Sequence, residues 1–432
     1  MARRFHIATL GCKINQYETQ ALREAWTDRG WTEAEAPDQA DLVVVNACAV
    51  TARAVRDTRK LVRQFAREAP GARLVVTGCT AQVMGEDMAA LPGVSAVVPQ
   101  ERKAALAADP MAEAKLPDAP AAACFPGFSV RGAERSRPVC KVQDGCSQCC
   151  TYCIVPLTRG RAVSREPAQV CAEVRRLLDN GYGEVVLSGI NLGQYGRGLS
   201  PKTDFWDLVA LLDRELAPAF AGRARLRLSS LDPGLLGPKA LDTLGASRMT
   251  CPHLHISLQS LSKPVLARMG RAHYGPEDVA GFVTNLATVW PVFGLGTDLL
   301  TGFPGETETE FEASMAAVSA LPLTYAHVFP YSRRPGTRAA AMPDQVPHAD
   351  KKARAAVLRA LADEKRKAFA QGLAGLPELT VAVLGDGRGL TEHYAHCRLS
   401  GDDALRPGVL AQAAPMATRS GRLEAAIIEQ SV

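Results

Sequence analysis

The sequence contains no apolar run that approaches about 18 residues, the length at which a stretch becomes a candidate membrane span. Its first residues lead directly into an apolar strand pattern, without the apolar segment and cleavage site of an export signal. We therefore expect a cytoplasmic protein with no membrane association. The excess of positive over negative charge is also small. The formal net charge of +5 does not by itself indicate a nucleic-acid partner.

Cysteine, in contrast, is abundant, with 12 residues in a chain of 432. Because thiols in the cytoplasm are kept reduced, these cysteines cannot form a disulfide framework, and metal binding or catalysis becomes the leading explanation. The chain is long enough for two or three domains, and its 47% hydrophobic and 22% charged residues are typical of a globular protein. The placement of the cysteines therefore decides between these roles.

Three apolar runs near the N-terminus each end in a cysteine, over residues 5–12, 41–48 and 73–79. Helical patterns over residues 17–29 and 52–67 separate them, so we expect strand-helix-strand units and a parallel sheet. Ligands of such sheets bind at the carboxyl edge, where residues that follow neighbouring strands converge. A lone cysteine is more often a small buried apolar residue, but recurrence at one structural position favours a shared ligand.

The cysteines at these three strand ends are Cys12, Cys48 and Cys79. Thiolates bind soft metals and iron–sulfur clusters, and three of them leave one iron of a 4Fe–4S cube without a protein ligand. The pattern therefore predicts a cluster at this edge whose open iron can bind exogenous sulfur.

A second motif places Cys146, Cys150 and Cys153 in C-x3-C-x2-C spacing, with Cys149 between them. One short loop of this kind wraps three corners of a 4Fe–4S cube and leaves the fourth iron free. Structural zinc is the alternative, but it usually takes two cysteine pairs, and no second C-x2-C pair follows in the sequence. Cys149 is an alternative ligand, which we interpret as a bystander.

Strand-like and helical runs alternate from about residue 138 onward. Six strands are expected, over residues 139–142, 184–188, 226–229, 253–258, 296–300 and 326–331. Helical patterns fill the gaps, for example over residues 166–178, 276–289 and 307–320. This order predicts an α/β fold in which an N-terminal parallel α/β domain precedes a partial parallel (β/α)6 barrel, with the chemistry at the carboxyl rim of the barrel.

The cysteine loop, with its Gly145-Cys146 and Tyr152-Cys153 pairs, resembles the radical S-adenosylmethionine (radical SAM) superfamily. The segments 188–191, 255–260, 297–306 and 327–332 are similar to signatures of its methylthiotransferases. The resemblance implies S-adenosyl-L-methionine and two 4Fe–4S clusters as cofactors. It assigns one cluster to Cys12, Cys48 and Cys79, and the other to Cys146, Cys150 and Cys153.

Small and polar residues near the loop and the barrel rim are candidates for binding S-adenosyl-L-methionine. Glycine permits close backbone approach, while amide, hydroxyl and carboxylate groups can hydrogen-bond to the polar parts of the cofactor. The candidates are Tyr152, Gly189, Asn191, Ser257, Gln259 and Asp298. No catalytic residue is assigned.

The resemblance implies four segments: an N-terminal methylthiotransferase domain over residues 1–115, a linker over 116–135, the radical SAM barrel over 136–368 and a small C-terminal all-β domain over 372–432. The last segment looks like the RNA-binding TRAM module, because strand patterns over residues 379–384 and 390–394 flank a glycine-containing turn. A plain β-appendage that only packs on the barrel is the alternative. A basic helix over residues 351–367 is expected to be a connector with a solvated face.

Three segments, over residues 9–18, 46–51 and 329–337, look most like the branch that adds a methylthio group to C2 of N6-threonylcarbamoyladenosine at position 37 of tRNA. The implied partners are the tRNA anticodon loop and an electron donor such as flavodoxin or ferredoxin. The alternatives are the same reaction on N6-isopentenyladenosine 37, methylthiolation of a ribosomal-protein side chain, and a non-catalytic iron–sulfur RNA-binding protein. Arg333, Arg334 and Arg338 are interpreted either as contacts to the RNA backbone or as ordinary exposed charges.

Overall fold

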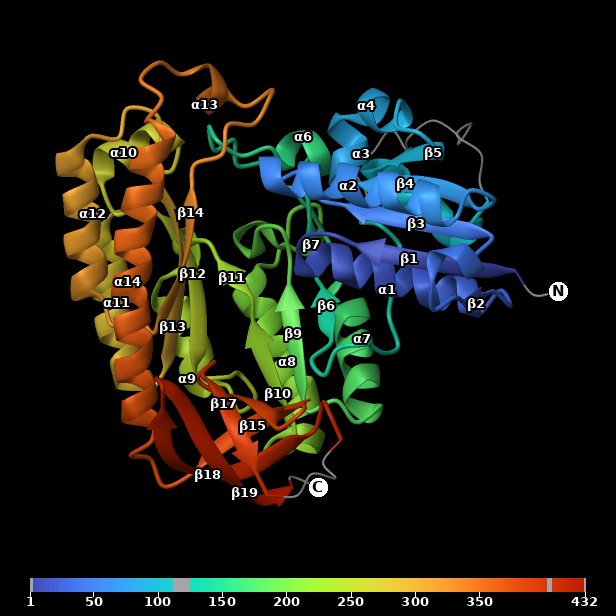
Figure 1. Ribbon diagram of the computed structural model, residues 1–432. Coiled ribbons are helices and arrows are strands. Elements are labelled where there is room, and N and C mark those ends of the chain that lie inside the picture. The colour runs from blue at the N-terminus through green and yellow to red at the C-terminus, as the bar shows by residue number, and fades with distance from the viewer. Residues whose placement is uncertain (1–2, 112–124, 402–405, 431–432) are drawn as a thin grey trace. The chain divides into compact units, whose positions relative to one another are not determined.

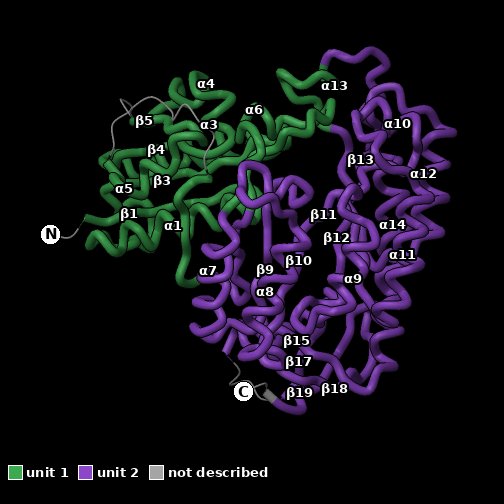
Figure 2. Tube along the Cα trace, turned by 180° about the vertical axis from the view of Figure 1, so that it is seen from behind, with its two compact units in different colours: residues 1–132, 143–165, 332–340 green, residues 133–142, 166–331, 341–432 purple. Residues whose placement is uncertain are grey.

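The computed structural model describes residues 3–111, 125–401 and 406–430 (Figure 1). The chain divides into two compact units (Figure 2). Unit 1 comprises residues 1–132, 143–165 and 332–340, and unit 2 comprises residues 133–142, 166–331 and 341–432. Residues 116–124 of the expected linker lie outside the described residues, and the expected domain boundaries stay predictions.

Unit 1 contains a parallel five-stranded sheet with the strand order β2-β1-β3-β4-β5. All six residues of β3 are buried, as expected for a β-branched strand that helices cover on both faces. Thr51 caps the N-terminus of α2 by accepting a hydrogen bond from the amide of Ala54. Val62 and Phe65 of α2 pack in the core of this sheet, so the parallel α/β arrangement expected for the N-terminal part is confirmed.

The strands of unit 1 are β1 (Arg4–Thr9), β2 (Thr32–Glu33), β3 (Leu42–Ala47), β4 (Arg73–Gly78), β5 (Val94–Pro99), β7 (Gln143–Asp144) and β8 (Val163–Ser164). Its helices are α1 (Lys13–Thr27), α2 (Ala52–Glu68), α3 (Cys79–Val83), α4 (Gly85–Ala89), α5 (Lys103–Ala108) and α6 (Val155–Arg159), with 3-10 turns η1 (Pro37–Gln39) and η2 (Gln100–Arg102). A short helix, α13 (Arg338–Ala341), begins in the last segment of this unit.

Unit 2 contains the six expected parallel barrel strands in sequence order. They form a three-stranded sheet, β10-β9-β6, and a four-stranded sheet, β11-β12-β13-β14. The third strand joins the two sheets, because β10 pairs with β9 and β11, one residue later, pairs with β12. Helices α11, α12 and α14 lie along the β12–β14 side (Figure 1). The partial (β/α)6 barrel is therefore confirmed, with its third strand split.

The strands of this barrel are β6 (Val139–Lys141), β9 (Glu184–Ser188), β10 (Arg225–Leu228), β11 (Ser230–Leu231), β12 (His253–Gln259), β13 (Gly294–Thr301) and β14 (Tyr325–Pro330). The helices are α7 (Pro167–Asp179), α8 (Phe205–Phe220), α9 (Pro238–Ala246), α10 (Lys263–Met269), α11 (Pro276–Val289), α12 (Glu308–Ala320) and α14 (His348–Leu373), with 3-10 turns η3 (Leu192–Gln194) and η4 (Pro233–Leu235).

The C-terminal part of unit 2 is a closed five-stranded barrel with the order β15-β16-β17-β19-β18. Its strands are β15 (Leu379–Gly385), β16 (Arg388–Thr391), β17 (His396–Ser400), β18 (Leu410–Arg419) and β19 (Arg422–Gln430). The small all-β domain is thus confirmed. The strand expected over residues 390–394 is wrong in its second half, because β16 ends at Thr391 and a turn follows that holds Tyr394 at a φ of +67°.

A buried ion network fastens this small barrel to the larger one. Glu184 of β9 is fully buried and accepts hydrogen bonds from Arg225 at 2.7 Å and from Arg227 at 2.6 and 2.8 Å. Arg137 adds a third ion pair at 3.0 Å. Arg225 and Arg227 also donate to four backbone carbonyls of residues 380–392, so one carboxylate organises the whole contact.

Helix α14 is longer than the helix expected over residues 351–367, and several of its basic side chains are engaged within unit 2. Arg359 donates to the carbonyl of Val328, and Lys365 donates to two carbonyls at the end of α12. Some basic side chains of α14 are therefore held by carbonyls of unit 2, while others, such as Lys352 and Lys367, are exposed, as a solvated face requires. No helix in the part of the chain that the structure describes is long and apolar enough to cross a membrane.

Candidate functional site

Three neighbouring strands of unit 1 are each followed at their carboxyl ends by a cysteine. Cys12 is the N-cap residue of α1 after β1, Cys48 follows β3, and Cys79 is the first residue of α3 after β4. Because β3 pairs in parallel with β1 on one side and with β4 on the other, the three cysteines lie at the same edge of the sheet. Cys48 and Cys79 are buried, whereas Cys12 is exposed.

Glycines bring these strand ends close together. Gly11 has a φ of +116°, and a Cβ on it would lie 2.5 Å from the Cβ of Cys48. Gly78 has a φ of +93°, and a Cβ on it would lie 2.5 Å from a backbone oxygen at the end of β3. Thr80 Oγ1 donates a hydrogen bond of 2.7 Å to the carbonyl of Cys48. Side chains at the two glycine positions would therefore force these strand ends apart.

The three thiols are near enough to influence one another electrostatically. Burial raises the pKa of the Cys48 thiol to about 11, and Cys79 and Cys12 add to the rise. The backbone amide of Val50 and the guanidinium of Arg159 oppose it. The thiolate is the form that binds metals, and with this raised pKa a positive group beside Cys48 favours that form. A metal centre and the nearby cation are groups of this kind.

A buried charge network joins α1 to the segment before the second cysteine motif. The side chain of Arg159 is 1% exposed, and its Nη1 donates to Glu18 at 2.8 Å and to Asp144 at 3.0 Å. Its Nη2 donates to Asn15 Oδ1 at 2.7 Å. Burial lowers the pKa of Arg159, but Glu18 and Asp144 outweigh this effect and hold it well above its ordinary value.

Lys103 completes the network from the end of the sheet. Its fully buried Nζ donates to Glu18 Oε2 at 2.6 Å and to Asn46 Oδ1 at 2.9 Å. No sequence pattern predicts this network, because its members are scattered from α1 to α6. One signal was present, since Asn15 and Glu18 lie three residues apart on the buried face of the helix that follows Cys12.

The loop over residues 145–153 carries the second set of cysteines. Gly145 has a φ of +64°, and a Cβ on it would lie 2.1 Å from a carbonyl oxygen of residues 160–161. The amide of Cys146 donates to the same segment at 3.0 Å, and the amide of Cys153 donates to the carbonyl of Cys150 at 3.1 Å. Cys146 is buried, while the other two are partly exposed, so the loop turns tightly around its cysteines.

Two further candidate residues lie within this loop. Cys149 is exposed, and its Sγ lies 3.9 Å from the carbonyl of Ser147. Tyr152 is partly exposed. Neither observation tests the expected ligand set, so the exclusion of Cys149 and the role of Tyr152 stay predictions.

The segment over residues 332–340 connects the surroundings of the two cysteine sets. Ser332 Oγ accepts a hydrogen bond of 3.3 Å from the amide of Ala52, at the start of the helix that follows Cys48. Arg338 Nη2 donates to the carbonyl of Cys149 at 2.5 Å, and the next amide, of residue 339, donates to the cysteine loop at 2.8 Å. This segment therefore contacts both cysteine-bearing regions of unit 1.

Arg334, in the middle of this segment, is buried with 5% of its area exposed. Interpreting it as an ordinary exposed charge is therefore wrong, while its contact to an RNA backbone stays a prediction. Arg333 and Arg338 are exposed, as both interpretations require. Burial lowers the pKa of Arg334, and the Cys48 thiolate opposes this effect.

Five candidate residues occupy the rim of the barrel in unit 2, and all are partly buried. Gly189 and Asn191 follow β9, and the Asn191 side chain caps the turn η3. Ser257 and Gln259 lie at the end of β12, and Asp298 lies in the adjacent strand β13. The structure thus brings the last three together on one sheet and places the first two after the end of a strand of the other sheet.

The end of β12 has an unusual backbone. Its register with β13 shifts between Ile256 and Gln259, and Gln259 has a φ of +63°. A positive φ in a residue other than glycine is uncommon; such residues occur in turns and also cluster at functional sites. Ser257 Oγ donates to the carbonyl of Leu231 at 3.1 Å.

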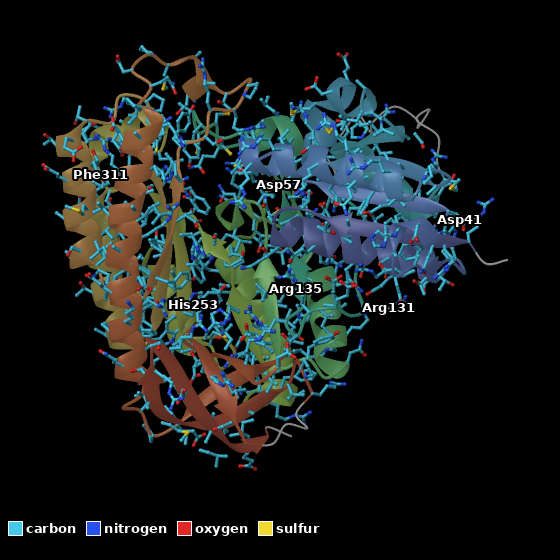
Figure 3. All side chains as sticks on the ribbon, in the orientation of Figure 1. Asp41, Asp57, Arg131, Arg135, His253 and Phe311 are labelled. Carbon is cyan, nitrogen blue, oxygen red and sulfur yellow. The ribbon has the colours of Figure 1, made fainter. Side chains whose placement is uncertain are left out.

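A hydrogen-bonded relay lies inside the barrel next to Asp298. His255 Nε2 lies 3.2 Å from Asp298 Oδ1, and His255 Nδ1 lies 2.9 Å from the hydroxyl of Tyr325. The same hydroxyl lies 2.9 Å from Nε2 of His253, which is labelled in Figure 3 and whose ring stacks on Tyr394 of the small barrel with centroids 4.4 Å apart. This relay therefore orients the carboxylate of Asp298 through its contact with His255.

This relay was not predicted from the sequence, although the alternation of residues within β12 and β14 carries a signal for it. Residues 253, 255 and 257 share one face of β12, and residues 325, 327 and 329 share one face of β14. Gly296 of the strand between them makes room, because a Cβ there would lie 2.0 Å from the ring of Tyr325.

The donor chemistry of unit 1 fits two iron–sulfur clusters. Within residues 3–111, 125–401 and 406–430, no three Cys, His, Asp or Glu side chains have the arrangement of a single-metal site. A 4Fe–4S cube binds each thiolate through a different iron, so its donors surround a cluster and not one ion. The buried cation Arg334, which lacks a carboxylate partner among the described residues, fits an anionic centre beside Cys48.

Two family models match the chain. One is described as "Uncharacterized protein family UPF0004" and covers residues 4–99, which include the first three cysteines. The other is the radical SAM superfamily and covers residues 140–318, which include the second three.

Curated relatives match over most of the chain. A Bacillus subtilis protein named "Threonylcarbamoyladenosine tRNA methylthiotransferase MtaB" is 36% identical over 374 residues, which are 85% of this chain and 81% of the relative. An Agrobacterium fabrum protein named "tRNA-2-methylthio-N(6)-dimethylallyladenosine synthase" is 32% identical over 396 residues, 87% of this chain and 85% of the relative.

A solved structure shows the same fold. The radical S-adenosylmethionine methyltransferase TsrM from Kitasatospora setae matches with a TM-score of 0.59 at 17% identity, and the match covers 78% of this chain and 75% of that chain.

Proposed function

This chain belongs to the radical SAM methylthiotransferase family, and on that premise we propose that it adds a methylthio group to C2 of N6-threonylcarbamoyladenosine at position 37 of tRNA. The observation that carries the proposal is the pair of three-thiol sets in a chain that spans four-fifths of a relative named for this reaction. Each set leaves one iron of a cubane without a protein ligand.

The cofactors are S-adenosyl-L-methionine and 4Fe–4S clusters, of which we assign two. Cys12, Cys48 and Cys79 hold one cluster, and their sheet edge matches a family model that is separate from that of the barrel. When bound, the cluster at the second cysteine motif supplies the electron that cleaves S-adenosyl-L-methionine to methionine and a deoxyadenosyl radical.

Residues of the second set hold the radical-generating cluster in this proposal. Cys146, Cys150 and Cys153 are its ligands, and the tight turn at Gly145 supports them because it anchors the loop on residues 160–161. Cys149 is exposed and stays outside the ligand set.

The chain's own polar groups bind and orient S-adenosyl-L-methionine in this proposal. Asp298 is held by His255 at 3.2 Å, and a fixed carboxylate suits hydroxyl or ammonium donors of the cofactor. Tyr152, Gly189, Asn191, Ser257 and Gln259 complete the candidate set, in which the positive φ of Gln259 indicates an imposed backbone conformation.

The substrate is tRNA, and an electron donor such as flavodoxin or ferredoxin reduces the protein in the cytoplasm. An unstacked base of an anticodon loop can leave its stack and enter a pocket, which is how proteins commonly read RNA. The closed small barrel of unit 2 is the proposed RNA-binding module, since small β-barrels commonly bind nucleic acid.

Nucleoside mass spectrometry of tRNA tests this proposal. A deletion strain is complemented with the intact gene, with Cys48→Ala, with Cys150→Ala, or with Cys149→Ala as the matched control. We expect 2-methylthio-N6-threonylcarbamoyladenosine to return with the intact gene and with Cys149→Ala only. If the deletion strain instead lacks the methylthio derivative of N6-isopentenyladenosine, the result would support the alternative reaction on that nucleoside.

Two further outcomes would replace the proposed substrate or activity. If neither nucleoside changes, the tRNA substrate is rejected, and ribosomal proteins are then examined for a methylthio side chain. If the reduced, reconstituted protein cleaves no S-adenosyl-L-methionine, the chain is a non-catalytic iron–sulfur RNA-binding protein.

A further inference from the structure

Arg334 is a buried cation for which the described residues offer no anionic hydrogen-bond partner. Its side chain is 5% exposed, its Nε has no hydrogen-bond partner, and none of the described residues accepts a hydrogen bond or forms an ion pair with its guanidinium. Arginine keeps its charge in proteins, so an isolated buried guanidinium is costly unless an anion accompanies it. This arrangement points to an anion that binds there.

The surroundings of Arg334 indicate where that anion lies. Ser332 contacts the start of the helix after Cys48, and Arg338 contacts the carbonyl of Cys149 in the second cysteine loop. Arg334 lies between these two anchors along the segment. Cys48 is near enough to act on it electrostatically: the ionised thiol raises the pKa of the guanidinium, against the larger effect of burial.

We propose that Arg334 is a positioning residue that holds an anionic sulfur species, such as hydrosulfide, at the Cys12–Cys48–Cys79 centre. The inference rests on the proposed function, because it requires a cluster with an open iron at these thiols. Three thiolates outweigh the positive charge of an oxidised cubane core, and a bound hydrosulfide adds a further negative charge. A guanidinium in a site of low dielectric stabilises this charge more strongly than water-exposed cations do.

The neighbouring cations differ in their partners. Arg159 is satisfied by Glu18 and Asp144, so its charge is already balanced within the protein. Arg333 is exposed. Arg334 is therefore the residue whose charge serves a group that is not part of the polypeptide, and Arg333 is a matched control one position away.

The test uses the full chain with Cys146, Cys150 and Cys153 changed to alanine, so that only the first cluster is reconstituted. Sodium sulfide is titrated anaerobically, and its binding is followed through the electron paramagnetic resonance spectrum of the reduced cluster. We expect Arg334→Gln to weaken sulfide binding at least tenfold and to shift the reduction potential of the cluster to a more negative value. Arg334→Lys should restore part of the sulfide affinity and part of the reduction potential, and Arg333→Gln should change neither quantity.

The possible results separate the inference from the proposed function. Unchanged sulfide affinity and potential in Arg334→Gln, with full iron content, would overturn the role of Arg334 and leave the cluster assignment intact. If Arg334→Gln loses its iron, the neutral variant Arg334→Met takes its place, and sulfide affinity and reduction potential equal to those of the parent in an iron-loaded Arg334→Met also overturn the role. If the parent protein binds no cluster, the proposed function and the inference both fail.

A carboxylate of the tRNA substrate is a rival anion. In the enzyme with both clusters, a higher KM for tRNA in Arg334→Gln, together with unchanged sulfide affinity in the single-cluster protein, would show that the guanidinium serves the substrate. That outcome overturns the proposal.

Discussion

Replacing Glu184 by glutamine removes the one carboxylate that three arginines share. The change preserves the size of the side chain but turns an acceptor oxygen into an N–H group that faces guanidinium donors. Arg225 and Arg227 pair with Glu184 at 2.6–2.8 Å and are themselves buried, so they cannot recover the lost interaction from water. The carbonyls of residues 380–392 then receive poorly oriented donors, and the contact between the two barrels of unit 2 weakens.

The expected cost follows from burial. Removing one partner of a buried ion pair typically costs about 3–5 kcal/mol, because uncompensated charge stays behind. At about 2–4 °C per kcal/mol for a unit of this size, unfolding should move down by roughly 6–20 °C. Glu215 provides the control, since its pair with Arg214 is exposed and Glu215→Gln should cost no more than about 1 kcal/mol.

The pH dependence of stability should change as well. Burial raises the pKa of Glu184, but Arg227 and Arg225 outweigh it and hold the pKa well below its ordinary value. The carboxylate therefore stabilises the native protein fully above the pKa of an unfolded glutamate, and this contribution is lost as the pH falls toward the native pKa. In Glu184→Gln, this part of the acid destabilisation should be absent.

Urea unfolding of the anaerobically prepared protein, followed by circular dichroism, measures the loss of stability. Limited proteolysis reports the release of the small barrel, with cleavage expected near residues 374–378. A loss below about 1 kcal/mol, equal to that of Glu215→Gln, would refute the reasoning, because it would mean that the three buried arginines do not need this carboxylate.

Two further predictions concern unit 1. Gly145→Ala should lower the iron content of the reconstituted protein by about half, because a Cβ at this position would lie 2.1 Å from a backbone oxygen and would force the second cysteine loop open. Iron and sulfide analysis measures this loss, and a full iron content would contradict the prediction. Arg159→Gln should cost about 3–5 kcal/mol in urea unfolding, whereas Arg131→Gln, which removes the exposed pair with Asp28, should cost at most about 1 kcal/mol; equal losses would contradict this.

The spacing of apolar residues and the positions of turn-forming residues were sufficient to predict most of the fold. Three of the five strands in the N-terminal sheet and the six barrel strands are found where the apolar runs predict them, since buried parallel strands are continuous apolar segments; the edge strands β2 and β5 were not predicted. The split of the third barrel strand into β10 and β11 was not predictable, because it depends on which neighbour each residue pairs with. The error after Thr391 has a local cause: its Oγ1 accepts from the amide of Ala395 and stabilises a turn.

The candidate site likewise has one part that could be predicted from the sequence and one part that could not. Cysteine spacing and strand-end position are local properties, so Cys12, Cys48 and Cys79 could be proposed as one set before their shared edge was seen. The charges around them were not predictable. Arg159 reaches Glu18 across 141 positions of sequence, and its two carboxylate partners come from different elements. No pattern within a short window reports such a pairing.

This division matters for what the site can do. Thiols alone specify where clusters bind, but the charges nearby decide how readily an anionic cluster is reduced and which further anions it accepts. In unit 1, Arg159 is neutralised by carboxylates of the protein, while Arg334 has no such partner among the described residues. Arg159 therefore links the elements of unit 1 that carry the two cysteine sets. The charge of Arg334 is available to an anion that binds beside Cys48, as proposed above. The difference in partners, which only the folded structure reveals, separates a charge that the protein's own carboxylates balance from one that no carboxylate of the described residues balances.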